Sequence, residues 1–261
     1  HPGGQAGIFL DHINWLHSVV TGKLGKRMMV WDDMFQHYPE VLSSLPRDIV
    51  LGCWDYGLIE GKPRWHFGDR PAIDKLEEFS SFGFECLIAP ADSPWLNPVT
   101  FTRYAETRPC LGGLLTMWEK GTSFYHASLP VVAATGKLCS GLEPEAAIQQ
   151  AVKTVFGFSD PVFSEAIRSF SILGQASSVL PSNLESYLHG GLTDQQHQRR
   201  STARLISQVL KKWETRLPTE IGRQITGDIL QVIDQLLLHY QLAEILPIFC
   251  SPETLAGEKE K

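Results

Sequence analysis

Four short apolar runs alternate with helix-forming segments in the first 140 residues, and this alternation constrains the fold more than any other feature. The runs cover residues 27–31, 48–54, 85–89 and 110–117. They are apolar at successive positions, as in strands that are covered on both faces. Predicted helices separate them, for example over residues 8–20 and 71–82. The alternation therefore predicts an α/β fold with a parallel sheet and helical crossovers.

The chain changes character after residue 142, because no strand-like run follows. Helices are predicted over residues 144–156, 161–179, 194–215 and 221–246. In the third of these, apolar residues recur at helical spacing opposite a row of Arg and Lys, which favours a solvated face over an anion site. We predict one domain over residues 1–142 and a helical region over residues 143–261, packed as a bundle or hairpin.

Composition limits the partners of the chain. The formal net charge is −6 and no basic block occurs, which argues against nucleic acid. No run of about 18 uncharged apolar residues occurs, so no membrane span is predicted. The five cysteines are odd in number and match no zinc spacing, which favours reduced thiols in a cytoplasmic, reducing compartment. His12, His17 and His37 have no partners at ligand spacing, so neither a metal nor another cofactor is expected.

Aromatic and acidic residues follow each apolar run. Ligands bind at the carboxyl ends of parallel strands, so we expect these residues to form a site. The candidate substrate-binding residues are Trp31, Asp32, Asp33, Trp54, Tyr56, Asp92, Trp95, Trp118 and Glu119, with Asp55 beside them. An indole stacks on the C–H face of a pyranose while carboxylates accept hydrogen bonds from its hydroxyls, which predicts a sugar site. The alternatives are tryptophans that only pack, and Asp33 and Asp92 as helix N-caps.

At these residues the chain resembles the C-terminal half of a family 20 glycoside hydrolase, a β-N-acetylhexosaminidase of the hexosaminidase D type. The resemblance covers about residues 7–140 and rests on VWDDM at residues 30–34, Trp54-Asp55, and a Gly-Gly pair five residues before Trp118. It implies strands five to eight of a (β/α)8 TIM barrel, followed by an all-α C-terminal region. Trp31, Trp54 and Trp118 would then wall the pocket for the 2-acetamido group.

The chain departs from the family pattern in two places. Glu119 directly follows Trp118, whereas many members have a small residue between the Trp and the Glu. Asp92, Trp95 and Asn97 match the family's Tyr and Asp after strand seven only loosely.

The resemblance also implies an activity. It indicates an exo-acting enzyme that releases terminal N-acetylglucosamine or N-acetylgalactosamine from glycans or glycosides by substrate-assisted retaining catalysis. The family's catalytic Asp-Glu pair has no counterpart here, so we expect it upstream of this chain. The isolated chain is then expected to be inactive without the N-terminal half of the barrel. A non-catalytic sugar-binding module and another TIM-barrel hydrolase are the alternatives, and a homodimer through the helices remains open.

Overall fold

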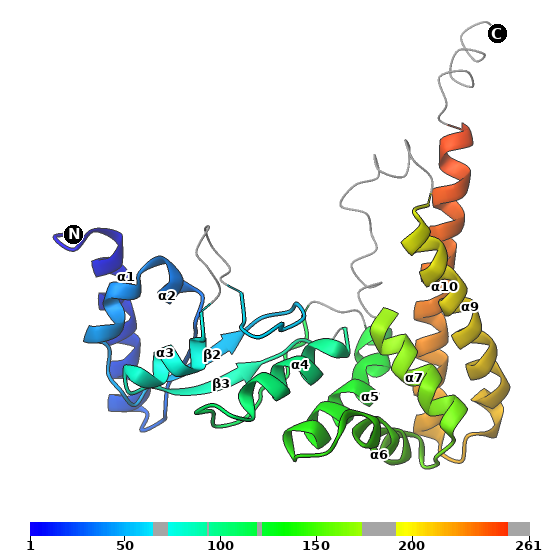
Figure 1. The fold of residues 1–261 in the computed structure, drawn as a ribbon, viewed down its shortest axis with the longest axis horizontal. Coiled ribbons are helices and arrows are strands. Elements are labelled where there is room, and N and C mark those ends of the chain that lie inside the picture. The colour runs from blue at the N-terminus through cyan, green and yellow to red at the C-terminus, as the bar shows by residue number, and fades with distance from the viewer. Residues whose placement is uncertain (65–72, 93, 119–121, 174–191, 250–261) are drawn as a thin grey trace, which may run out of the picture. The chain divides into compact units, whose positions relative to one another are not determined.

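The computed structural model describes residues 1–64, 73–92, 94–118, 122–173 and 192–249. By its internal contacts the chain divides into two compact units. The first comprises His1–Asp92 with Leu96–Thr116, and the second comprises Ser93–Trp95 with Met117–Lys261. Figure 1 shows their elements.

The first unit is built on a parallel sheet. Its three strands are β1 (Met29–Trp31), β2 (Val50–Trp54) and β3 (Glu85–Ala89), in the order β1-β2-β3. Its helices are α1 (Gly4–His17), α2 (Met34–His37), α3 (Lys75–Ser81) and α4 (Leu96–Ala105). A π-helical turn (Ser18–Lys23) continues α1, and a 3-10 helix (Pro39–Ser44) follows α2. The strand register pairs Trp31 with Gly52, and Trp54 with Ala89.

The prediction of strands five to eight of a TIM barrel is wrong. In the described part of the chain the sheet has three strands, and the structure is about 65% helical. The fourth apolar run, residues 110–117, lies along residues 86–92 and exchanges backbone hydrogen bonds with them, such as Ile88 N to Gly112 O and Thr116 N to Pro90 O. Its strand pairing is nevertheless limited to two isolated parallel bridges, Ile88–Gly113 and Ala91–Thr116. Gly112 has a φ of 146°, outside the range of regular strands, and adjacent glycines offer no side chains to pack. The run therefore follows β3 without forming a regular fourth strand.

The two faces of the sheet differ in how far helices bury them. Leu51, Cys53 and Ile88 on one face are buried in a cluster with Phe79 of α3 and Phe101 of α4. Side chains alternate between faces along a strand, so the other face carries the remaining residues. These are Met29, Trp31, Val50, Gly52, Trp54, Glu85, Leu87 and Ala89. Met29 and Glu85 are exposed, Trp31, Trp54 and Leu87 are half-buried, and Val50, Gly52 and Ala89 are buried. The apolar runs predicted burial on both faces, whereas only one face carries the helical core.

The second unit consists of helices in its described part. These are α5 (Thr122–Cys139), α6 (Pro144–Phe156), α7 (Pro161–Leu173), α9 (Asp194–Trp213) and α10 (Glu220–Phe249). Local signals set several ends: Pro144 begins α6, left-handed Gly157 ends it, and Thr193 and Gln196 form a capping box on α9. The core gathers Phe156, Phe163, Ile206, Leu210, Ile229 and Ile233. None of the described helices has both the length and the apolar character needed to cross a membrane.

Phe163 provides a test of this helical core. It is fully buried, and its ring lies 4.9 Å from the ring of Phe156 at 78°. We predict that Phe163→Ala lowers the free energy of unfolding by about 3–5 kcal/mol, because the cavity cannot collapse completely. The neighbouring Val162 is 61% exposed, so Val162→Ala should cost less than about 0.5 kcal/mol. Urea unfolding followed by far-UV circular dichroism measures both, and equal losses would contradict the packing.

Candidate functional site

The carboxyl ends of the three strands bring several predicted residues together. β1 ends at Trp31 and is followed by Asp32, and β2 ends at Trp54 and is followed by Asp55. Because the strands are parallel and paired in register, these residues meet at one edge of the sheet. We refer to this region as the strand-end site.

Two aromatic surfaces lie at the strand-end site. The Trp31 ring rests on Gly52, its register partner, so closely that a Cβ at Gly52 would lie 3.0 Å from Trp31 Cε3. The rings of Trp54 and Tyr56 contact one another, with centroids 4.9 Å apart and an interplanar angle of 35°. All three aromatic residues are half-buried. The sheet edge therefore presents partly accessible aromatic rings from two neighbouring strands.

Asp32 lies inside the protein at this edge. Its Oδ2 is 2.7 Å from Lys75 Nζ, and both side chains are fully buried. Asp32 Oδ1 accepts a hydrogen bond from the backbone N–H of Trp54 at 3.2 Å, and Lys75 Nζ donates to the carbonyl oxygen of Trp54 at 3.2 Å. The carboxylate of Asp32 thus binds the backbone of Trp54, the residue that carries one of the aromatic rings.

Asp55 is also fully buried and organises the loop after β2. It accepts hydrogen bonds from Gly57 N at 2.9 Å, Arg64 N at 2.7 Å and Arg64 Nη2 at 3.0 Å. Burial by itself raises the pKa of the Asp55 carboxyl, but the hydrogen bonds and charge of Arg64 and the Gly57 bond outweigh it and hold the pKa below its ordinary value. Asp55 is therefore an anchor for residues 57–64.

Asn97 on α4 joins the loops that follow β2 and β3. Its Oδ1 accepts from Ala91 N at 2.8 Å, and its Nδ2 donates to the carbonyl oxygens of Asp55, at 2.8 Å, and Gly57. The side chain is fully buried. One amide thereby fixes the backbone beyond two strands, which supports a preformed site.

The other candidates differ in their surroundings. Asp33 is half-buried next to α2, and its side chain makes no capping hydrogen bond. Asp92 is buried, and its N–H donates to the carbonyl oxygen of Thr116 at 3.1 Å. Trp95 is buried in the second unit, where its N–H donates to Ser171 O at 3.1 Å. Trp118 is 53% exposed and also belongs to the second unit, while Glu119 lies outside the described residues.

Lys75 and Arg64 were not among the predicted site residues. Lys75 lies four residues before Phe79 on the predicted helix, so it shares the apolar side of that helix. A lysine on the apolar side of a predicted helix, where a charged side chain needs a buried partner, was the available signal. Arg64 lies in a loop rich in Gly and Pro, where spacing alone assigns no partner.

The buried thiol of Cys53 on β2 is not in an environment that would activate it for catalysis. Burial raises the pKa of the Cys53 thiol well above its ordinary value, and the hydrogen bond with Cys86 and the charge of Asp32 raise it further. Cys53 is therefore protonated at neutral pH and is not a nucleophilic thiolate. Within the part of the chain that the structure describes, no group of three His, Cys, Asp or Glu residues is placed to hold a metal ion.

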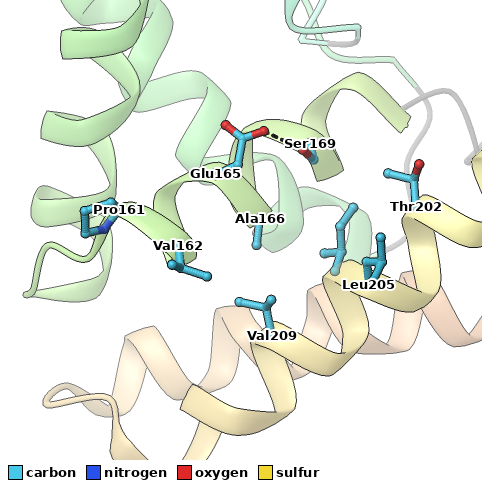
Figure 2. A pocket seen from close by; sticks show the side chains of 9 residues that line it. Pro161, Val162, Glu165, Ala166, Ser169, Thr202, Leu205 and Val209 are labelled. Atoms are coloured by element: carbon cyan, nitrogen blue, oxygen red, sulfur yellow. Dashed lines mark hydrogen bonds between the residues drawn. The ribbon is translucent and has the colours of Figure 1, made fainter.

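A separate hollow lies between α7 and α9 of the second unit (Figure 2). It is an apolar groove of about 420 Å³. Its lining consists of Pro161, Val162, Glu165, Ala166, Ser169, Thr202, Leu205, Ile206 and Val209. Glu165 accepts hydrogen bonds from Ser169 Oγ at 3.0 Å and from Arg168, so its charge is balanced at the rim. The groove offers apolar surface and no evident catalytic group, in contrast to the strand-end site.

Comparisons with known proteins identified no relative of this chain. No protein-family model matches the chain, and no curated protein or solved structure is significantly similar to it. The resemblance to family 20 glycoside hydrolases therefore rests on the sequence motifs alone.

The lowered pKa of Asp55 makes the stability of its loop dependent on pH. Since the folded carboxyl binds a proton less readily than the unfolded one, Asp55 stabilises the fold above its ordinary pKa of 3.8 and loses this effect as the pH falls below that value. We predict that Asp55→Asn is destabilising at pH 6 and that its deficit relative to wild type shrinks between about pH 4 and pH 2. Urea unfolding across this range measures the difference, and a deficit that is independent of pH would contradict the assignment.

Proposed function

We propose that the strand-end site binds the terminal N-acetylhexosamine of glycans or glycosides. The observation that carries the proposal is the set of three partly accessible rings, Trp31 on β1 and the Trp54–Tyr56 pair at 4.9 Å, gathered at the carboxyl end of a parallel sheet. An aromatic ring buries the C–H face of a sugar without competing for its hydroxyls. The buried contacts of Asp32, Asp55 and Asn97 support a rigid platform beneath these rings.

We further propose that this binding serves an exo-acting β-N-acetylhexosaminidase. The motifs shared with family 20 glycoside hydrolases support this assignment, and in that family the acetamido oxygen of the substrate attacks the anomeric carbon. Asp32 and Asp55 are both engaged inside the protein, so neither is a suitable general acid for a glycosidic oxygen. This is consistent with a catalytic Asp-Glu pair that comes from outside this chain.

The burial of those two carboxylates also favours a second candidate, a sugar-binding module without catalysis. The two candidates share the binding step and differ in the reaction. Binding of N-acetylglucosamine-thiazoline, which mimics the bicyclic intermediate, would favour the hydrolase, because a simple binding module has no reason to prefer that ring system.

Sugar binding is tested by replacing an aromatic ring. We predict that N,N′-diacetylchitobiose changes the intrinsic tryptophan fluorescence of the chain, and that Trp54→Ala weakens this binding by about tenfold, as expected when about 1.4 kcal/mol of stacking is lost. Fluorescence titration measures both affinities.

Trp15 supplies the matched control for this experiment. It is 59% exposed near the end of α1. His17, two residues after Trp15, contacts Asp48 at 2.8 Å, and Asp48 lies two residues before β2 begins. This end of α1, which carries Trp15, therefore lies near the amino ends of the strands, away from the strand-end site. Trp15→Ala should leave the affinity unchanged. Failure of the wild-type chain to bind any N-acetylated sugar would overturn the proposed function.

Hydrolysis is tested separately. We predict that the isolated chain does not release a chromogenic leaving group from an N-acetylglucosaminide above the rate in buffer, because Asp32 and Asp55 are held inside the protein and are not suited to protonate the leaving oxygen. Absorbance of the released phenolate measures this rate. Turnover by the purified chain that disappears in Trp54→Ala would show that the chain contains its own acid and would contradict the prediction.

A further inference from the structure

We propose that Lys75 is a positioning residue of the strand-end site, one that holds Trp54 in place for its ligand through the buried pair with Asp32. This inference rests on the proposed sugar site, in which Trp54 is a stacking ring. It concerns how that site is kept in order and does not assign Lys75 any contact with the sugar.

The pair replaces a rung of the sheet that β1 does not supply. Up to that point the ladder between β1 and β2 is regular, with Val50 N donating to Met28 O and Asp32 N donating to Gly52 O. The next rung would run from Trp54 N to the carbonyl oxygen of Asp32, but that oxygen accepts from Phe35 N, where α2 begins. The main chain has left the sheet, and the side chain of Asp32 takes over the bond to Trp54 N at 3.2 Å.

Lys75 completes this replacement at the carbonyl oxygen of Trp54. Its Nζ donates to that oxygen at 3.2 Å and lies 2.7 Å from Asp32 Oδ2. Both backbone polar groups of Trp54 that face β1 are therefore bound by one ion pair. Trp54 is the last residue of β2, so without this pair its backbone would be the frayed end of a strand.

The base of Lys75 is itself held firmly. The preceding residue, Asp74, accepts hydrogen bonds from Tyr104 Oη at 2.5 Å and Arg108 Nε at 2.7 Å. Leu76, the following residue, donates its N–H to Tyr104 Oη at 3.2 Å. The start of α3 is thus tied to the end of α4, and the lysine reaches Trp54 from a fixed position.

Stability alone does not account for this arrangement. Burying two opposite charges carries a desolvation cost that their attraction often fails to exceed, and an apolar pair of similar volume is commonly as stable. What an apolar pair cannot do is bind the N–H and carbonyl oxygen of Trp54. The polar pair therefore determines the position of the Trp54 backbone, and through it the ring that contacts Tyr56.

The experiment compares two double variants that separate stability from positioning. Asp32→Leu with Lys75→Met replaces the pair by apolar side chains and removes both bonds to Trp54. Asp32→Asn with Lys75→Gln is uncharged but keeps an acceptor for the N–H and a donor for the carbonyl oxygen. Urea unfolding of both variants shows whether each one folds.

Two readouts are then measured on each folded variant. The first is the ¹⁹F spectrum of protein labelled with 5-fluorotryptophan, in which the Trp54 signal is assigned by its loss in Trp54→Phe and no ligand is present. The second is the affinity for N,N′-diacetylchitobiose. We expect the apolar pair to broaden or shift the Trp54 signal and to weaken binding by about tenfold, while the amide pair recovers most of both. Trp15→Ala is the control for both readouts.

The two readouts distinguish failure of this inference from failure of the proposed function. If the wild-type chain binds no sugar, the proposed function fails, and the ¹⁹F signal alone decides whether Lys75 orders Trp54. If the apolar pair folds and keeps both the wild-type Trp54 signal and the wild-type affinity, the positioning role of Lys75 is wrong. If the amide pair folds and behaves like the apolar pair, the bonds to Trp54 are not its basis and the role is equally wrong. Should the apolar pair fail to fold, the amide pair is compared with the wild-type chain. An amide pair that keeps most of the wild-type Trp54 signal and affinity supports the role of Lys75, and a folded amide pair that loses both contradicts it.

Discussion

The ion pair between Asp32 and Lys75 is the interaction on which the strand-end site depends. It is fully buried, with 2.7 Å between the charged atoms, and it holds the last residue of β2 after β1 has left the sheet. Buried charges are tolerated when their hydrogen-bonding capacity is met, and here part of that capacity is met by the backbone of Trp54. The same contacts join β1, β2 and α3, so the sheet edge and the first turn of α3 are one structural unit.

The other buried polar groups at this edge follow the same rule. Asp55 binds the backbone of Gly57 and Arg64, and Asn97 binds Ala91 together with the carbonyl oxygens of Asp55 and Gly57. Each of these groups would be costly to bury without partners, so each constrains a loop. Carboxylates and amide therefore form the base of the site, and the half-buried aromatic rings are left as its contact surface. In the proposed sugar site, the buried polar groups hold the backbone and the aromatic rings contact the sugar.

The sequence predicted the positions of the sheet and of most helices, because apolar runs and capping signals act over a few residues. The runs ending at Trp31, Trp54 and Ala89 form strands, and α6 occupies the predicted residues 144–156. The fourth run was misjudged, since an apolar pattern does not reveal that Gly112 takes a φ of 146° and interrupts regular pairing. The prediction of a barrel was wrong for a related reason: closure of a sheet depends on pairing between distant strands, which local periodicity does not specify.

The sequence by itself determined that aromatic and acidic residues follow parallel strands, and hence that Trp31, Asp32, Trp54 and Tyr56 share one edge of a sheet. Only the tertiary structure decided what each of them does there. An Asp after a strand has the same local pattern whether it faces solvent or lies against a lysine 43 positions later in the chain, and Asp32 lies against Lys75. That choice follows from burial and from hydrogen-bonding needs of the Trp54 backbone, which exist only once β1, β2 and α3 have packed together.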